Sequence, residues 1–442
     1  MLSNTYSLYL VQLFAFLNVA ATNLYSSARA QAGGNSPKAE SVVRTANNIA
    51  FRCGVGLMIF VMVFSRQLLR LYIGAEAADT PGVLDAACNY VKIRSLSMPT
   101  YIVTGVLQAA LLGAQDSVTP LISILYSTIV NVVGDFVLVN RLQMGLSGAA
   151  MATTAAQWAA TWALIGPARR KLVKDHQLGI FRKKNVEGGV TGRSFLGFAA
   201  PVLTLILGKL AAFGFMTHSA AAAPGQPTPL AVHQVILSLL FFCSPFLEVI
   251  SQTAQTFLPP FVSPLDEYTG RMLKRNPKYN ARLDTKVQAW RASSQSAAST
   301  LLKLGFSVAV VIASAAALIP AYFGGVITSD PTVQQAVKPL AKYLWLGAFF
   351  WAPVAVCEGV LLARRELAFL ASVYLASTAL LPPALLRIKH QGGGVEQVWG
   401  CFAIFQLCRA AAFMAKIWWG PLWRRLRGTD TRRPDSPSAV SQ

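Results

Sequence analysis

Residues 101–158 read YIVTGVLQAALLGAQDSVTPLISILYSTIVNVVGDFVLVNRLQMGLSGAAMATTAAQW. The segment consists of apolar runs of roughly 20 residues, the length at which an α-helix crosses the hydrocarbon core of a bilayer. Very short turns join these runs. The turn at Gly113–Asp116 is followed by Pro120, a residue that fits the first turn of a helix. The pattern therefore predicts consecutive membrane-spanning helices.

Polar residues occur inside one of these runs. Asn131 and Asp135 are four residues apart, so their side chains share one face of a helix. An ionisable group in the middle of a span costs about 2.5–3.5 kcal/mol on insertion scales. This cost indicates that the pair has a function.

Part of the segment recurs later in the chain at an offset of 250 positions. A second recurrence, Phe16–Val19 with Phe246–Val249, has an offset of 230. A polar insert around 264–291 accounts for the difference. The pairs at offset 250 are Leu111–Leu112 with Leu361–Leu362, Asp116 with Glu366, and Gln108 with Glu358. A duplicated helical bundle with polar groups at matching depths is typical of transporters.

Composition sets the class of protein. Of the 442 residues, 54% are hydrophobic and 13% are charged, whereas a soluble domain has about 25% charged residues. The chain is therefore predicted to be an all-α polytopic membrane protein embedded in a lipid bilayer. Most of the net charge of +21 lies in a few loops and the tail, as an orientation signal does, so nucleic-acid binding is not expected. The sequence contains no nucleotide loop, metal-ligand spacing or catalytic triad, so we expect no enzyme, no metal and no cofactor.

Eleven spans are predicted, five before and six after a basic connector at 169–193. Phe16 aligns with Phe246 in the second span of the later half, so the earlier half is expected to lack a first span and the native protein to have twelve. The predicted spans are 6–28, 49–73, 90–112, 118–139, 146–166, 195–217, 230–257, 297–323, 342–362, 367–386 and 398–418.

The repeat also predicts the domains. We expect an N-terminal lobe at 1–168, the connector at 169–193, and a C-terminal lobe at 194–420 that includes the insert. A basic tail at 421–442, rich in Pro, Ser and Arg, is expected to be disordered. Basic residues are concentrated in every second loop along the chain. This bias places the C-terminus on the cytosol-equivalent side of the membrane.

Several motifs in one order resemble the multidrug and toxic compound extrusion (MATE) family, and some resemble its plant and algal plastid branch in particular. The resemblance covers nearly the whole chain. The motifs are LLGAQDS at 111–117, NVVGD at 131–135, GLSGAAMAT at 145–153, AVHQV at 231–235, EVISQTAQ at 248–255 and EGVLLAR at 358–364.

The resemblance implies two six-helix lobes and secondary active export of a small organic solute in antiport with H⁺ or Na⁺ by alternating access. It further implies an aromatic acid or an organic cation as solute, a monomer, and a plastid-envelope location. The absent first helix carries an acidic residue used for ion coupling in many members, so the N-lobe ion site is expected to be incomplete.

Two glutamates are the strongest candidates for ion coupling. Glu358 lies in mid-span, where a low dielectric favours the neutral form of a carboxyl group, so it could take up and release a proton. Glu248 follows Pro245, which can kink a helix and free backbone carbonyls. The structural alternative for both is bonding to a neighbouring helix. If they share one cavity, they titrate as a coupled pair.

Other polar residues in spans are candidates for ion and solute contacts. Asp135 with Asn131 could form a second proton or Na⁺ site, or hydrogen-bond between helices. Lys209, in mid-span, could neutralise a glutamate, receive an anionic solute, or extend to the interface. Four glutamines could line a wet cavity or bond helices together: Gln108, Gln234, Gln252 and Gln255.

Two alternatives to a solute exporter remain open. A lipid-linked precursor flippase of the same superfamily would require several cationic side chains in its cavity, and Lys209 is the cation that the sequence places in mid-span. A non-transporting remnant would fit the absence of a first span.

Overall fold

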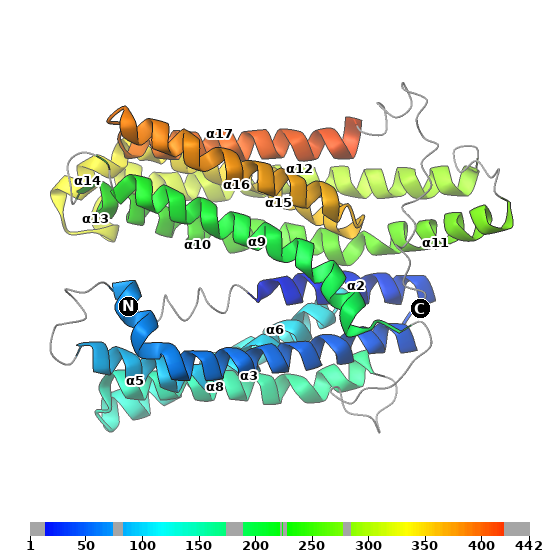
Figure 1. Cartoon of the computed structure of the whole chain (residues 1–442), viewed down its shortest axis with the longest axis horizontal. Coiled ribbons are helices and arrows are strands. Elements are labelled where there is room, and N and C mark those ends of the chain that lie inside the picture. The colour runs from blue at the N-terminus through cyan, green and yellow to red at the C-terminus, as the bar shows by residue number, and fades with distance from the viewer. Residues whose placement is uncertain are drawn as a thin grey trace. The chain divides into compact units, whose positions relative to one another are not determined.

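The computed structural model describes residues 14–73, 83–173, 189–221, 223, 228–276 and 284–419, and these residues form helices joined by short turns (Figure 1). The first residues of the span predicted at 6–28, most of the connector, part of the insert and the whole tail lie outside this range. Two compact units, Met1–Ile206 and Leu207–Gln442, divide the chain inside one helix.

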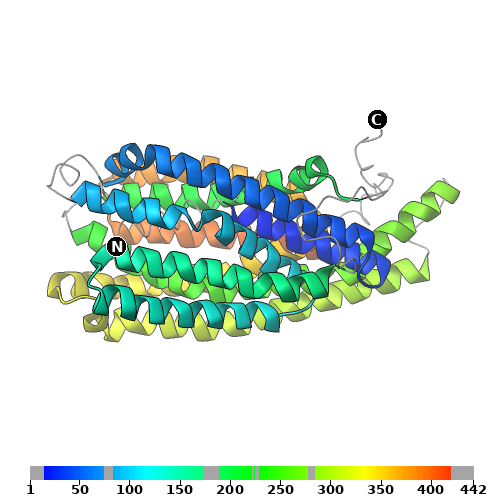
Figure 2. The ribbon, with the colours of Figure 1, turned by 90° about the horizontal axis from the view of Figure 1, so that it is seen from below.

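Unit 1 contains α2 (Ala15–Ala32), α3 (Pro37–Ile73), α5 (Val83–Ser95), α6 (Met98–Gly113), α7 (Val118–Asp135) with a π-helical continuation at Phe136–Arg141, and α8 (Gly145–Leu172). Helix α6 packs against α2, α3 and α8, and α7 runs alongside α8 (Figure 2). Only 6% of an apolar 18-residue segment within Val118–Arg141, which comprises α7 and its continuation, is buried. Such exposure is expected of a helix that faces lipid.

The boundary between the units falls in α9 (Gly192–Ala221). Unit 2 continues with α10 (Thr228–Phe257), α11 (Pro259–Arg275), α12 (Thr285–Tyr322), the short α13 (Gly324–Ile327) and α14 (Pro331–Val337), α15 (Ala341–Ala363), α16 (Leu367–His390), and α17 (Val395–Met414) with a π-helical end at Ala415–Trp419. Helix α15 packs against α10, α12 and α17. It is the central helix of unit 2, since 78% of an apolar 18-residue segment within Pro331–Ala363, the stretch that ends with α15, is buried.

Among the described residues, eight helices are long and apolar enough to span a bilayer. The number is nine if α5 and α6 together form one broken span. Of the predicted spans, the first and fifth correspond to α2 and α8, which do not meet this criterion. The prediction of eleven spans is therefore confirmed only in part.

The third predicted span is not one straight helix. Helices α5 and α6 meet at an angle of 45°, and Pro99 is at the start of α6. Proline lacks an N–H donor and its ring clashes with the carbonyl four residues earlier, so the helix breaks between Ser95 and Met98.

Two helices are much longer than predicted. Helices α3 and α12 have 37 and 38 residues, about 55 Å at 1.5 Å per residue, whereas the bilayer core is about 30 Å thick. The part of the insert that the structure describes is helical, belonging to α11 and the start of α12.

The turns after α6 and α15 have the same backbone geometry. Gln115 (φ 66°) and Arg365 (φ 58°) both have left-handed conformations, which are unfavourable for residues other than glycine. The N–H of Asp116 donates to the carbonyl of Leu111 over 2.9 Å, and Glu366 donates to Leu361 over the same distance. These positions are 250 residues apart, the offset of the sequence repeat.

Candidate functional site

Two glycines bring the helices of unit 2 close together around Lys209 and Glu358. A Cβ atom on Gly208 would lie 2.9 Å from Oγ1 of Thr378, and one on Gly359 would lie 2.5 Å from the backbone oxygen of Ser251. At Gly359 the neighbour is backbone, so only glycine permits this approach of α15 to α10, whereas at Gly208 a larger residue would displace the Thr378 side chain of α16. The neighbouring residues, Lys209 and Glu358, are thereby directed into the same space.

Glu358 is buried, with 6% of its surface exposed, and has a donor on each carboxylate oxygen. Lys209 Nζ lies 3.0 Å from Oε1, and the Tyr374 hydroxyl donates to Oε2 over 2.6 Å. Hydrogen bonds with an ionised partner are short and strong. The geometry therefore fits an ionised Glu358 that is neutralised by Lys209.

Glu248 shares Lys209 with Glu358. Its Oε1 lies 3.6 Å from Lys209 Nζ, and the indole N–H of Trp351 points to its Oε2 at 3.5 Å. One ammonium thus bridges two carboxylates on different helices. The two glutamates predicted from sequence lie in one cluster, and its central cation is the lysine predicted in mid-span.

Arg409 of α17 and Tyr374 of α16 complete the cluster. The Arg409 guanidinium carbon is 5.3 Å from the centre of the Tyr374 ring, and Lys209 Nζ is 5.8 Å from the same centre. Both distances are within cation–π range. Sequence analysis did not identify either residue. A single arginine within the apolar run of α17 was the signal that could have revealed Arg409, whereas a tyrosine in an apolar helix is unremarkable.

A pocket opens beside these charges. Aromatic side chains form much of its wall, and Phe213 stacks on Trp351 with ring centres 6.0 Å apart. The lining residues are Lys209, Ala212, Phe213, Trp351, Val354, Ala355, Glu358, Tyr374, Phe402, Gln406 and Arg409. Apolar walls with a few convergent polar groups are typical of small-molecule sites.

The four predicted glutamines lie elsewhere. Gln234 and Gln252 are exposed, and Gln255 is buried with its amide directed to Ser251 Oγ at 3.3 Å. Gln108, in unit 1, donates to Ser123 Oγ over 3.3 Å. None of the four lines the pocket described above, and their solute-binding role stays a prediction.

The predicted Asn131–Asp135 pair lies in unit 1. The Asn131 amide donates to Oγ1 of Thr153 on α8 over 3.3 Å. Oδ1 of Asp135 is buried and has no hydrogen-bond partner among the described residues. These oxygen atoms are hard ligands of the kind that alkali cations favour. Among the described residues, no group of three or more His, Cys, Asp or Glu side chains could hold a metal ion.

Comparisons with known proteins give a matching family model and several relatives. The MatE family model matches residues 1–137. The chain is 24% identical over 404 residues to "Protein DETOXIFICATION 47, chloroplastic" of Arabidopsis thaliana. This alignment covers 91% of this chain and 68% of that protein. The chain is 28% identical over 310 residues to DNA damage-inducible protein F of Escherichia coli (strain K12), covering 69% of this chain and 60% of that protein.

A solved structure agrees in fold. The crystal structure of the eukaryotic MATE transporter AtDTX14 superimposes with a TM-score of 0.72 at 18% identity, covering 96% of this chain and 90% of that one. The fold is thus the MATE fold, as the sequence motifs predicted, and the family consists of transporters and not of enzymes. The family model over residues 1–137, the relatives and the fold agree that this chain is a multi-pass membrane protein similar to the transporters of the MATE family.

Proposed function

We propose that this chain is a secondary active transporter that exports a small organic solute in antiport with H⁺ by alternating access. The observation that carries the proposal is the cluster of the buried Glu358 with the partly exposed Lys209 and Glu248 beside a pocket with aromatic walls. Charges in a membrane span are costly and mark ion or substrate paths.

The donors around Glu358 favour H⁺ over Na⁺ at this position. Its two carboxylate oxygens face an ammonium and a hydroxyl, whereas Na⁺ requires oxygen ligands. A proton can neutralise Glu358 without any further oxygen ligands. The Asn131–Asp135–Thr153 group offers oxygen atoms instead, so Na⁺ stays a second candidate ion for unit 1.

Protonation of Glu358 would change the partner of Lys209. Once Glu358 is neutral, the ion pair at 3.0 Å loses its attraction, and Glu248 at 3.6 Å becomes the stronger partner. A cationic solute would compete with the proton for these carboxylates, which is the requirement for exchange. The cluster thus provides two charge states that a pair of conformations can use.

The test is flux through proteoliposomes with an imposed pH gradient. Two probes of equal size and permanent opposite charge are used, benzenesulfonate and benzyltrimethylammonium. We expect the gradient to accelerate uptake of at least one probe, and Glu358→Gln to abolish this acceleration. An unchanged response in Glu358→Gln would remove this residue from the mechanism, and gradient-driven flux of either probe would rule out a non-transporting remnant.

The flippase alternative is favoured by one observation, a second cation, Arg409, in the pocket. The pocket also contains Glu358, and its walls are aromatic, so a diphosphate headgroup would meet a carboxylate. We therefore place this function second. Binding of a polyprenyl diphosphate tighter than that of benzenesulfonate would reverse this order.

We also propose a plastid envelope location, because one relative carries the word chloroplastic in its name. Fluorescence of a C-terminal fusion in plant cells that surrounds the chlorophyll signal would support this location. Fluorescence confined to the plasma membrane would contradict it.

A further inference from the structure

Unit 2 contains a helical projection that has no counterpart in unit 1. In unit 1, α2 ends at Ala32 and α3 begins at Pro37, so a short turn joins them. The repeat offsets of 230 and 250 place the equivalents of these two residues at 262 and 287, and the corresponding connection of unit 2 is 20 residues longer. The repeated fold therefore does not require the insertion. We call its described helical part, residues 266–275 of α11 and 285–293 of α12, the stalk.

The stalk extends beyond the ends of the neighbouring helices of unit 2 (Figure 1). Arg364, in the turn between α15 and α16, donates to Ser294 Oγ over 3.3 Å, and the indole N–H of Trp418 at the end of α17 donates to Ser299 Oγ over 3.2 Å. These contacts place the turn and the end of α17 level with this part of α12. Residues 285–293 therefore project about 13 Å further, at 1.5 Å per residue.

Side-chain contacts hold the two helices of the stalk together. The Tyr268 hydroxyl donates to Asp284 Oδ2 over 3.0 Å, and the Tyr268 ring packs edge-on against Trp290 with ring centres 5.7 Å apart. Asp284 also accepts hydrogen bonds from the backbone N–H groups of Lys286 and Val287, which caps the start of α12. The stalk is thus a folded element with a defined outer surface.

The outer end of the stalk is basic. Its cations Lys274, Arg275 and Lys286 are exposed, and we call them the basic tip. Nearby, Glu267 pairs with Arg271 at 3.7 Å. No acidic side chain lies within ion-pair distance of the basic tip in the parts of the chain that the structure describes. The helix dipole favours cations in the last turn of α11, but it leaves their charged groups turned to solvent.

The distance of the basic tip from the bilayer limits which counter-charge can reach it. Headgroups occupy about 5–8 Å on each side of the hydrocarbon core, whereas the tip lies about 13 Å beyond the turn between α15 and α16. Exposed charges are screened over about 8 Å at physiological ionic strength. The tail at 421–442 is itself basic, so it would repel the tip. An acidic surface that approaches from the aqueous phase matches both the charge and the position.

We propose that the basic tip of the stalk docks an acidic segment of a soluble protein, on the side of the membrane where α17 ends. Arg271, Lys274 and Arg275 are spaced i, i+3 and i+4, so their side chains share one face of α11, and carboxylates repeated once per helical turn would face them. The inference goes beyond the proposed transport function, because the basic tip is not part of the pocket around Glu358.

Binding of a fluorescently labelled hexaglutamate peptide tests this surface, with the full chain in nanodiscs of neutral phosphatidylcholine and anisotropy as the readout. The stalk variant combines Lys274→Gln, Arg275→Gln and Lys286→Gln, and we expect it to bind the peptide at least tenfold more weakly than the wild type. Added salt should weaken binding to the wild type.

A matched control removes three exposed cations from the other end of unit 2, through Lys338→Gln, Arg387→Gln and Lys389→Gln. This control has the same net charge as the stalk variant and should bind the peptide as the wild type does. Equal affinities of the control and the stalk variant would overturn the proposal, because net charge and not the basic tip would then determine binding.

The same titration in nanodiscs that contain phosphatidylglycerol distinguishes a soluble partner from lipid. The tenfold difference between wild type and stalk variant should persist there. Its disappearance would show that lipid headgroups occupy the basic tip, and would overturn docking of a soluble protein. Gradient-driven flux should be equal in the stalk variant and the wild type, so a failure of docking and a failure of the proposed function are separate results.

Discussion

Tyr374 is the residue on which the charged groups of the candidate site converge. It is fully buried, its hydroxyl donates to Glu358 over 2.6 Å, and both Lys209 and Arg409 lie within 6 Å of its ring centre. The hydroxyl stabilises the ionised carboxylate and the ring faces two cations. Tyr374 therefore positions the carboxylate of Glu358 and the two cations relative to one another.

Replacing Tyr374 with Phe should slow gradient-driven transport. The variant keeps the ring and removes a hydrogen bond to a charged group, which contributes about 1.5–3 kcal/mol. The carboxylate of Glu358 then loses one of its two donors, so uptake of the probe at a fixed pH gradient should fall severalfold.

The control for Tyr374→Phe is Tyr343→Phe. Tyr343 lies on α15, and its ring contacts Lys342 at 4.9 Å, away from the hydrogen bonds of Glu358. Equal rates of gradient-driven uptake by Tyr374→Phe and Tyr343→Phe would contradict the positioning role of the Tyr374 hydroxyl.

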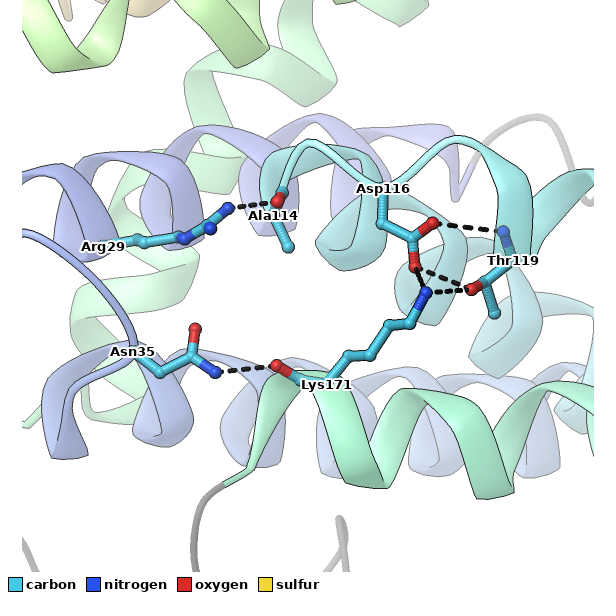
Figure 3. A network of polar contacts seen from close by, with 6 residues as sticks. All are labelled: Arg29, Asn35, Ala114, Asp116, Thr119 and Lys171. Carbon is cyan, nitrogen blue, oxygen red and sulfur yellow. Dashed lines mark hydrogen bonds and ion pairs between the residues drawn. The ribbon is translucent and has the colours of Figure 1, made fainter.

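At the scale of helices, an ion pair in each unit connects a left-handed turn to the end of a later helix. Asp116, after α6, lies 2.6 Å from Lys171 at the end of α8, and Glu366, after α15, lies 3.3 Å from Lys416 beyond α17. In Figure 3 Thr119 joins the first pair, its hydroxyl donating to Asp116 over 2.6 Å. Arg29 and Asn35 reach carbonyls of the same region, Ala114 and Lys171. Equivalent turns are thus fixed by equivalent charges.

The Asp116 network should stabilise unit 1 in a pH-dependent way. Burial alone raises the pKa of the Asp116 carboxyl, but the hydrogen bonds from Lys171 and Thr119 outweigh it, so the pKa lies below its ordinary value of 3.8. A lowered folded-state pKa contributes stability above the unfolded-state value, and this contribution disappears as pH falls through the folded-state value. Asp116→Asn should therefore reduce thermal stability at pH 7, and the difference from wild type should shrink below about pH 3.9.

The magnitude expected for the ion pair itself is modest. Lys171 is half exposed, so a double-mutant cycle with Asp116→Asn and Lys171→Met should give a coupling energy of about 0.5–1 kcal/mol. The comparison pair is Arg66–Asp85, at 3.1 Å with both side chains 68% exposed. A pH-independent difference for Asp116→Asn, or coupling no larger than for the comparison pair, would refute the stabilising role.

At the scale of the whole molecule, the sequence predicted the features that a lipid environment requires, namely apolar helices with few charges. A bilayer requires long apolar helices, so most spans were found, and Lys209 and Glu358 were noticeable because a charge in mid-span is costly. The break at Ser95–Met98 was missed, since a proline near a span end is common. The mutual contact of Lys209, Glu358 and Glu248 depends on close helix approaches at Gly208 and Gly359, which no single span reveals.

For the candidate site, the main unknown was the direction in which each polar side chain points from its helix. A helix that is apolar nearly all round gives no periodic signal, so the sequence does not show which way Gln252 points. It lies exposed and outside the pocket lining, and its solute-binding role stays a prediction. Arg409 was missed although it is a single arginine within the apolar run of α17, because the sequence does not show which neighbours its side chain meets. Only packing against Tyr374 distinguishes it.

The crossing of α8 decides how many spans unit 1 has. This helix is rich in Ala, Gly, Ser and Thr and does not meet the length and apolarity criterion, yet it packs along the lipid-exposed α7. Small residues allow close helix contact, and a neighbouring helix can shield polar side chains from lipid. We therefore expect α8 to cross the bilayer.

Cysteine labelling tests this crossing in a variant that lacks the six native cysteines. Gln143→Cys precedes α8 and Arg170→Cys lies in its last turn, and Arg365→Cys and Gln391→Cys flank α16, which meets the criterion for a span. A membrane-impermeant maleimide should label Gln143→Cys from the same side as Gln391→Cys, and Arg170→Cys from the side of Arg365→Cys. If both positions around α8 react from one side, α8 does not cross, and the sequence repeat would no longer correspond to equivalent topology in the two units.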